Sequence, residues 1–109
     1  MAIHRFQPSH YHTTIGSHEP VLQIDDGDTV ITTTVDALGK DASDTPVTPK
    51  GNPQTGPFYV IGAEPGDTLI VELERIWPSR AIGYTSSVVA ANIVDPSYVQ
   101  GLPEREWAE

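Results

Sequence analysis

Histidines gather at the start of the chain, where they are candidates for metal binding or acid–base chemistry. All four of them, His4, His10, His12 and His18, lie within the first eighteen residues, and no acidic residue precedes Glu19. On an extended segment His10 and His12 project to the same side, about 7 Å apart, so their imidazoles can converge on one ion. The alternative is an exposed segment whose histidines only hydrogen-bond nearby loops, and we favour it for His4 and His10.

Asp36 is the candidate catalytic carboxylate. It ends a run of β-branched residues and begins a long loop. A carboxylate on a loop carried by a rigid scaffold is a common site of chemistry, and it can complete a ligand set with two imidazoles. The structural alternative is an Asx-turn that ends the strand.

Asn52 and Thr55 carry groups that suit a small carboxamide. The Asn52 side chain offers both a donor and an acceptor, and the Thr55 side chain offers a hydroxyl group. Both lie in the stretch Asn-Pro-Gln-Thr-Gly-Pro at residues 52–57. The alternative is a locked turn that leads into the next strand, and we keep it for the prolines and the glycine of this stretch.

Short strands and turns must position these side chains. Residues 68–74 alternate apolar and acidic side chains, as in a half-buried strand with one wet face. Gly-Asp-Thr-Val-Ile from residue 27 recurs as Gly-Asp-Thr-Leu-Ile from residue 66, which favours a sandwich of similar hairpins. Residues 37–57 are predicted to form a long loop, and residues 81–94 a bulged strand or a loop–strand mixture. Further strands are predicted at residues 21–24, 29–36 and 58–61, and turns at residues 25–28 and 64–67.

The composition fits one small domain of mainly β structure. With 109 residues, nine glycines and ten prolines, the chain favours a single β-sandwich-like domain over residues 1–109, with long Pro/Gly-rich loops. The net charge of −9 opposes binding to nucleic acid or to anionic membranes. The absence of cysteine fits a reducing compartment, and the first residues lack the apolar run of a signal peptide. We therefore expect a cytoplasmic protein.

Several stretches, in their order along the chain, resemble the acetamidase/formamidase family. The likeness spans residues 12–73, and it continues more weakly from residue 83 to Trp107. The last two stretches named below are specific as a pair, although either alone is weak. The stretches are His18-Glu19-Pro20-Val21-Leu22, Asp26-Gly27-Asp28-Thr29-Val30, Thr34-Val35-Asp36-Ala37, Asn52-Pro53-Gln54-Thr55-Gly56-Pro57 and Gly62-Ala63-Glu64-Pro65-Gly66-Asp67-Thr68-Leu69.

The resemblance implies a hydrolase that releases ammonia from formamide, acetamide or similar small amides. It also implies oligomeric assembly and a divalent metal ion, zinc or calcium. It adds weight to His12 and His18 as metal ligands, to Asp36 as a catalytic residue, and to Asn52 and Thr55 as substrate-binding residues.

This chain departs from the family pattern in its length. It is much shorter than the usual member, and the family's later Asp-x-His-Ala-x-Gln-Gly-Asp-Gly-Glu-like stretch, which we connect with the active site, has no counterpart. We therefore expect the amino-terminal portion of a longer enzyme, completed by a carboxy-terminal segment or by further copies of the chain.

Two other classes of function stay open. The first is a non-catalytic β subunit or interaction module that kept the family's scaffold without its chemistry. The second is a small metal-binding protein that uses the histidine-rich start. Partner complexes and tolerance of Asp36→Ala are expected of the former, and bound metal that depends on His10 and His12 is expected of the latter.

Overall fold

The computed structural model describes residues 1–84, 93, 95–101 and 107–108. The chain divides into two compact units, Met1–Ser79 and Arg80–Glu109. No helix in these described ranges has the length and hydropathy that crossing a bilayer requires. The first unit contains β1 (Ile3–Arg5), β2 (Leu22–Ile24), β3 (Thr29–Ile31) and β4 (Phe58–Val60). The second contains β5 (Gly83–Tyr84), the 3-10 helix η1 (Pro96–Gly101) and β6 (Trp107–Ala108).

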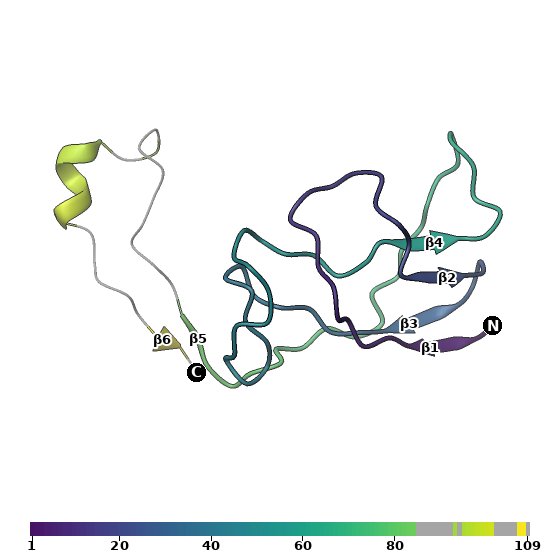
Figure 1. Ribbon diagram of the computed structural model, residues 1–109, viewed down its shortest axis with the longest axis horizontal. Helices are drawn as coiled ribbons and strands as arrows, with labels where there is room; N and C mark the ends of the chain where they lie inside the picture. The colour runs from purple at the N-terminus through teal and green to yellow at the C-terminus, as the bar shows by residue number, and fades with distance from the viewer. Residues whose placement is uncertain (85–92, 94, 102–106, 109) are drawn as a thin grey trace. The chain divides into compact units, whose positions relative to one another are not determined.

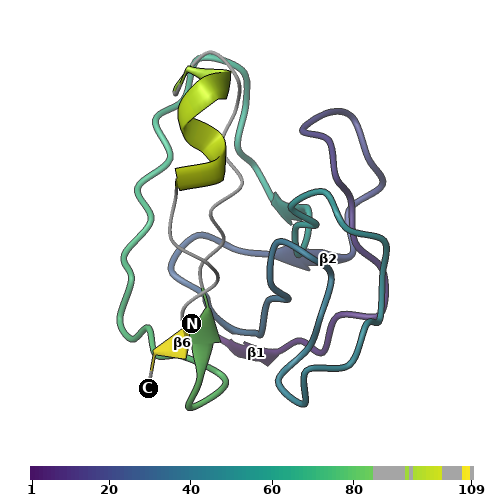
Figure 2. The same ribbon diagram turned by 90° about the vertical axis from the view of Figure 1, so that its left-hand side faces the viewer.

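The strands of the first unit form two small parallel sheets. β1 pairs with β3, and β2 pairs with β4, so each partner is reached by a long crossover connection. The β2–β4 pair lies over the β1–β3 pair (Figures 1 and 2). β5 and β6 pair with each other in antiparallel fashion in the second unit. The expectation of a largely non-helical chain with short strands is therefore confirmed.

The predicted hairpin across residues 25–28 is wrong, although the turn itself forms. The Asp28 amide donates to the Asp25 carbonyl at 3.1 Å, and Gly27 takes a φ of 86°, which glycine adopts without steric cost. However, β2 and β3, which this turn joins, do not pair with each other. Each pairs instead with a strand that is distant in sequence, a choice that local turn chemistry does not encode.

The two longest predicted strands differ from the structure. β3 ends at Ile31, short of the predicted end at residue 36. Residues 68–74 form no strand, and both faces of this segment are exposed, with Leu69 at 67% and Ile70 at 88%. Figure 1 shows the segment returning past the two sheets without joining either of them. Of the predicted region 81–94, β5 is described, while residues 85–92 and 94 lie outside the described residues.

Residues 37–57 form the predicted loop, and backbone hydrogen bonds within it fix its course. The Ala37 carbonyl accepts from the amides of Gly51 and Asn52, both at 3.1 Å. The Gly39 carbonyl accepts from the amide of Val47 at 2.9 Å. Gly39 takes a φ of +80°, and a Cβ atom there would overlap the carbonyl oxygen of Thr48. The two ends of this loop therefore lie together.

The Asp28 carboxylate holds β1 in place beside the turn. Oδ1 accepts the Ala2 amide at 2.7 Å, and Oδ2 lies 2.8 Å from Nε2 of His4 and 3.0 Å from the Asp25 amide. The side chain of Asp28 is 5% exposed. These bonds, above all the one with His4, lower the pKa of the Asp28 carboxyl below its ordinary value of 3.8.

Because the folded state lowers this pKa, it favours the ionised carboxylate, and Asp28 contributes stability above pH 3.8. We predict that this contribution is lost as the pH falls below that value, so β1 detaches first. Amide hydrogen exchange of Ala2 and Phe6, whose amides donate to the Asp28 carboxylate and to the Ile31 carbonyl, measured between about pH 6 and pH 2, should show protection that falls with acid. Asp28→Asn should expose these amides already at neutral pH, whereas Asp26→Asn, the same change on an exposed neighbour, should not. Equal protection in both variants would contradict the clamp.

Candidate functional site

The histidine-rich start lies against the predicted substrate-binding stretch. His12 and Gln54 form an antiparallel bridge, in which the Gln54 amide donates to the His12 carbonyl at 2.8 Å and the reverse bond measures 3.3 Å. A Cβ atom on Gly51 would lie 3.5 Å from Cγ2 of Thr13, which is ordinary van der Waals contact. Two segments about forty residues apart in sequence are therefore side by side.

His12 and His18 come together as a stacked pair. Their ring centroids are 3.8 Å apart, and the ring planes differ by 7°. Nε2 of His18 lies 2.9 Å from the Thr14 carbonyl oxygen and 3.0 Å from the Thr14 hydroxyl. Because a carbonyl oxygen only accepts, Nε2 carries the hydrogen in that bond, and in the neutral ring Nδ1 holds the lone pair. The turn from Thr14 to His18 thus fixes the orientation of one ring of the pair.

The stacked rings do not fit a shared divalent ion as they lie. Each nitrogen lone pair lies in the plane of its ring, so two nearly parallel planes aim their lone pairs side by side. Zinc needs lone pairs that converge at 2.0–2.1 Å, and calcium prefers oxygen ligands. Among the described residues no group of three or more His, Asp or Glu side chains could hold an ion together. The proposed set of His12, His18 and Asp36 is therefore not assembled in this arrangement.

Asp36 makes the bonds of the Asx-turn alternative. Its Oδ1 accepts the backbone amides of Leu38 at 3.0 Å and Lys40 at 2.9 Å. Its own amide donates to the Lys40 carbonyl at 2.9 Å, and the Asp36 carbonyl accepts from Gly39 at 2.9 Å. The carboxylate therefore fixes the first turn of the long loop. The next residue, Ala37, accepts the amide of Asn52.

Asn52 and Thr55 lie on the predicted connection, and the backbone determines how each is presented. Asn52 takes a left-handed φ of 57° while its amide bonds to Ala37, and its side chain is exposed. The Thr55 hydroxyl donates to the Thr33 carbonyl at 2.8 Å. That bond uses the hydroxyl hydrogen, so the Thr55 oxygen faces any ligand as an acceptor.

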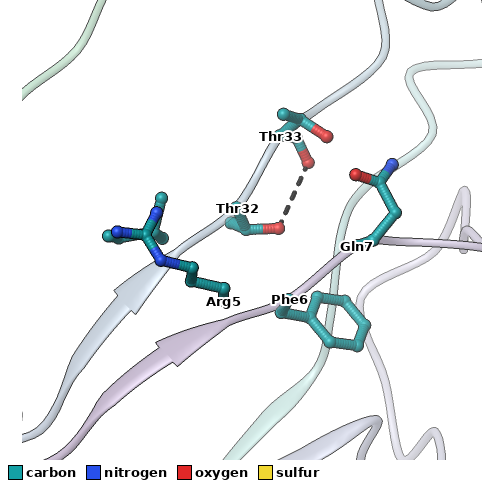
Figure 3. A pocket seen from close by; sticks show the side chains of 6 residues that line it. Arg5, Phe6, Gln7, Thr32 and Thr33 are labelled. Atoms are coloured by element: carbon teal, nitrogen blue, oxygen red, sulfur yellow. Dashed lines mark hydrogen bonds between the residues drawn. The ribbon is translucent and has the colours of Figure 1, made fainter.

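The first unit has two hollows that sequence reasoning did not identify, and neither is lined by any of the predicted site residues, His12, His18, Asp36, Asn52 and Thr55. One, of about 220 Å³, is bordered by residues directly before His12 and Asp36. The other, of about 200 Å³, shares Gln7 and Thr33 with the first. Figure 3 shows Arg5, Phe6 and Gln7 on one segment and Thr32 and Thr33 on the segment beside it. The first hollow is lined by Gln7, Tyr11, Thr33, Thr34, Val35, Asp41, Ala42 and Ser79.

The first hollow is rich in groups that hydrogen-bond. Gln7 supplies a carboxamide, Tyr11 a phenol, and Thr33, Thr34 and Ser79 hydroxyl groups. The sequence signal was present in the run of threonines at the end of the β3 stretch. It was missed because those threonines fit a longer strand equally well.

No family model, curated protein or solved structure matches the chain. The acetamidase/formamidase resemblance therefore rests on the sequence motifs, and the activity that it implies stays a prediction.

The bridge between His12 and Gln54 yields a test of this arrangement. Gln54→Pro removes the amide that donates to the His12 carbonyl, and we expect it to cost about 1 kcal/mol and to separate the two imidazoles. Stacked rings shield each other's protons, so the imidazole signals in proton NMR should move downfield. Gln54→Ala keeps the amide and should leave the shifts unchanged. Identical spectra for the two variants would mean that the bridge does not hold the stack.

Proposed function

We propose that this protein hydrolyses the carbon–nitrogen bond of small aliphatic amides, of the formamide or acetamide type, and releases ammonia. The observation that supports the proposal is the stacking of His12 on His18 beside the 52–57 connection, which His12 joins through its bridge to Gln54. In a pocket built from these residues, the segment that contains His12 and His18 would supply an imidazole base, and residues 52–57 would supply the groups that bind the carboxamide.

The hollow beside Tyr11 and Val35 is the proposed place for the amide. Its volume of about 220 Å³ leaves room for a molecule of a few heavy atoms together with water. The hydroxyl groups and the Gln7 carboxamide can pair with the substrate's carbonyl and amino groups. Asn52 and Thr55 are proposed to contact the amide from the connection, with the Thr55 oxygen accepting an N–H of the substrate.

An imidazole of the stacked pair is the proposed general base. It takes a proton from water as the water oxygen bonds to the amide carbon, and it returns the proton to the nitrogen as the carbon–nitrogen bond breaks. The products are a carboxylic acid and ammonia. Because the described residues do not fit a divalent ion, no step in this scheme passes through a metal.

The proposed architecture completes a β-sandwich by assembly, in an oligomer or with a complementary carboxy-terminal segment. Its support is the small size of each two-stranded sheet, since such sheets are marginal on their own. The cytoplasm is the proposed location, on the basis of the cysteine-free and acidic sequence.

The first test measures ammonia release from formamide and acetamide. We expect His12→Ala and His18→Ala to lower the rate by about 10²–10⁴-fold, the usual contribution of a positioned base. His10→Ala, the same change on an exposed histidine whose ring bonds to the neighbouring Ser9 hydroxyl, serves as the matched control. Each assay is run with and without added zinc, and we expect no difference. Silence of this chain together with activity of a chain extended beyond Glu109 would support an enzyme that is incomplete in this chain alone, whereas silence of both would remove the amidase proposal. A zinc-dependent rate would show that the rings rearrange to bind metal.

A pair of substitutions separates the two interpretations of Asp36. An asparagine oxygen can still accept the amides of Leu38 and Lys40, whereas alanine cannot. If Asp36 positions the loop, Asp36→Asn should retain most of the activity, and Asp36→Ala should lose it together with about 1–3 kcal/mol of stability. The measurements are kcat and thermal unfolding. Loss of kcat in Asp36→Asn without loss of stability would instead identify the carboxylate as catalytic.

A non-catalytic interaction module is the second candidate, and one observation favours it. None of the apolar side chains in the described part of the chain is fully buried, and residues 69–77 expose a series of them. A surface of this kind is typical of a subunit that completes its burial against a partner.

A further inference from the structure

Two turns in the first unit have the same construction. In the first, at residues 25–28, the last residue's amide donates to the first carbonyl at 3.1 Å, and the Asp28 carboxylate accepts the Asp25 amide at 3.0 Å. In the second, at residues 64–67, the corresponding distances are 3.0 Å and 2.8 Å, with Asp67 and Glu64 in these roles. The third residue of each is a glycine with positive φ, 86° and 102° respectively. The sequence echo is therefore also a structural one.

The first turn also holds β1 in place. β1 pairs with β3, and β3 directly follows this turn. The Asp28 carboxylate receives the Ala2 amide and Nε2 of His4. β1 then runs parallel to β3, with Ile3 opposite Thr29 and His4 opposite Val30. A turn of this design, with the strand after it, thus binds a parallel strand that carries an imidazole at its second position.

The second turn is followed by the same kind of sequence, yet no strand from the described ranges lies along it. Residues 68–70 read Thr-Leu-Ile where residues 29–31 read Thr-Val-Ile. Leu69 and Ile70 are mostly exposed, and within the described residues Asp67 accepts no hydrogen bond from another segment. The Thr29 hydroxyl reaches Glu74 at 3.4 Å, which anchors the far end of this segment.

We propose that residues 67–70 bind a parallel β-strand of a partner protein, one with a histidine or a basic side chain between apolar ones. Asp67 receives this side chain and a backbone amide, as Asp28 receives those of β1. The residue with the cationic or imidazole group lies opposite Leu69, the position equivalent to Val30.

The charge of the segment selects this occupant. Residues 64–74 contain four carboxylates and no basic residue, and the chain as a whole has a net charge of −9. A strand with a basic or imidazole group is attracted here, whereas the same edge of a second copy would bring like charges into register. The partner we infer is therefore a basic strand of a different protein.

The test uses a labelled peptide of residues 1–7 of this chain as the simplest strand with the required chemistry, titrated into the full chain by fluorescence anisotropy. We expect saturable binding that weakens at least about tenfold in Asp67→Asn, which keeps the Glu64 bond but removes the charge. Asp26→Asn makes the same change in the other turn and should bind like the parent. Asp28→Asn weakens the hold on the chain's own β1, so any change in peptide binding in this variant measures how far the peptide replaces β1 at the first turn.

A second variant keeps the experiment decisive if Asp67→Asn does not fold. Thr68→Pro leaves every charge in place but removes the amide equivalent to that of Thr29, which donates to the Ala2 carbonyl at 2.9 Å. Thr68→Pro should abolish binding, and so should the change His4→Glu in the peptide. Binding that ignores Asp67→Asn and Thr68→Pro overturns the proposal. So does concentration-dependent self-association of the chain that the free peptide reverses, because the edge then binds β1 of a second copy.

Discussion

The first unit depends on hydrogen bonds between backbone segments that are distant in sequence. Among its described residues the buried apolar side chains are those of Pro8 and Pro53, and none of the larger ones is buried, so the usual hydrophobic contribution to stability is small. Main-chain bonds instead join distant segments at three places: β1 with β3, β2 with β4, and His12 with Gln54. The edge-to-face contact of Phe6 with Phe58, at 5.6 Å between ring centroids, links the two sheets. A fold of this kind tolerates surface changes but responds sharply to the loss of one amide or one clamping carboxylate.

Features set by neighbouring residues could be predicted from the sequence. Both Gly-containing turns form, because the glycines accept positive φ and the aspartates bond back to the turn's first residue. Strands β2 and β4 lie where short apolar runs predicted them, and residues 37–57 are a loop. The choice of partners for these strands was not predictable, because parallel pairing is decided by crossover connections rather than by adjacent turns. Residues 68–74 have the alternation of apolar and polar side chains that is typical of a strand. A strand also needs a second segment to pair with, and the local sequence does not show whether one is present.

The candidate site shows the same division between local and distant information. That Asp36 could form an Asx-turn followed from its residue type, and the two amide bonds to Oδ1 are of that kind. That His12 would stack on His18 followed from no local rule, since five intervening residues must turn the chain back. The polar hollow beside Tyr11 was missed because its residues come from several separate segments, among them 33–35 and Ser79. A single sequence ranks such residues by type, and only the folded chain groups them.

The repeated turn is followed by a paired strand in its first copy, whereas in its second copy no strand from the described residues pairs with the segment that follows. Burying Leu69 and Ile70 would stabilise the protein by about 1.5–3 kcal/mol for each side chain, so leaving them exposed has a real cost. Open strand edges are also hazardous, and proteins commonly protect them with charge. Asp67, Glu72 and Glu74 provide that protection, because two copies of this edge repel each other. The same carboxylates attract a basic strand, so a single set of charges opposes self-pairing while it selects the partner.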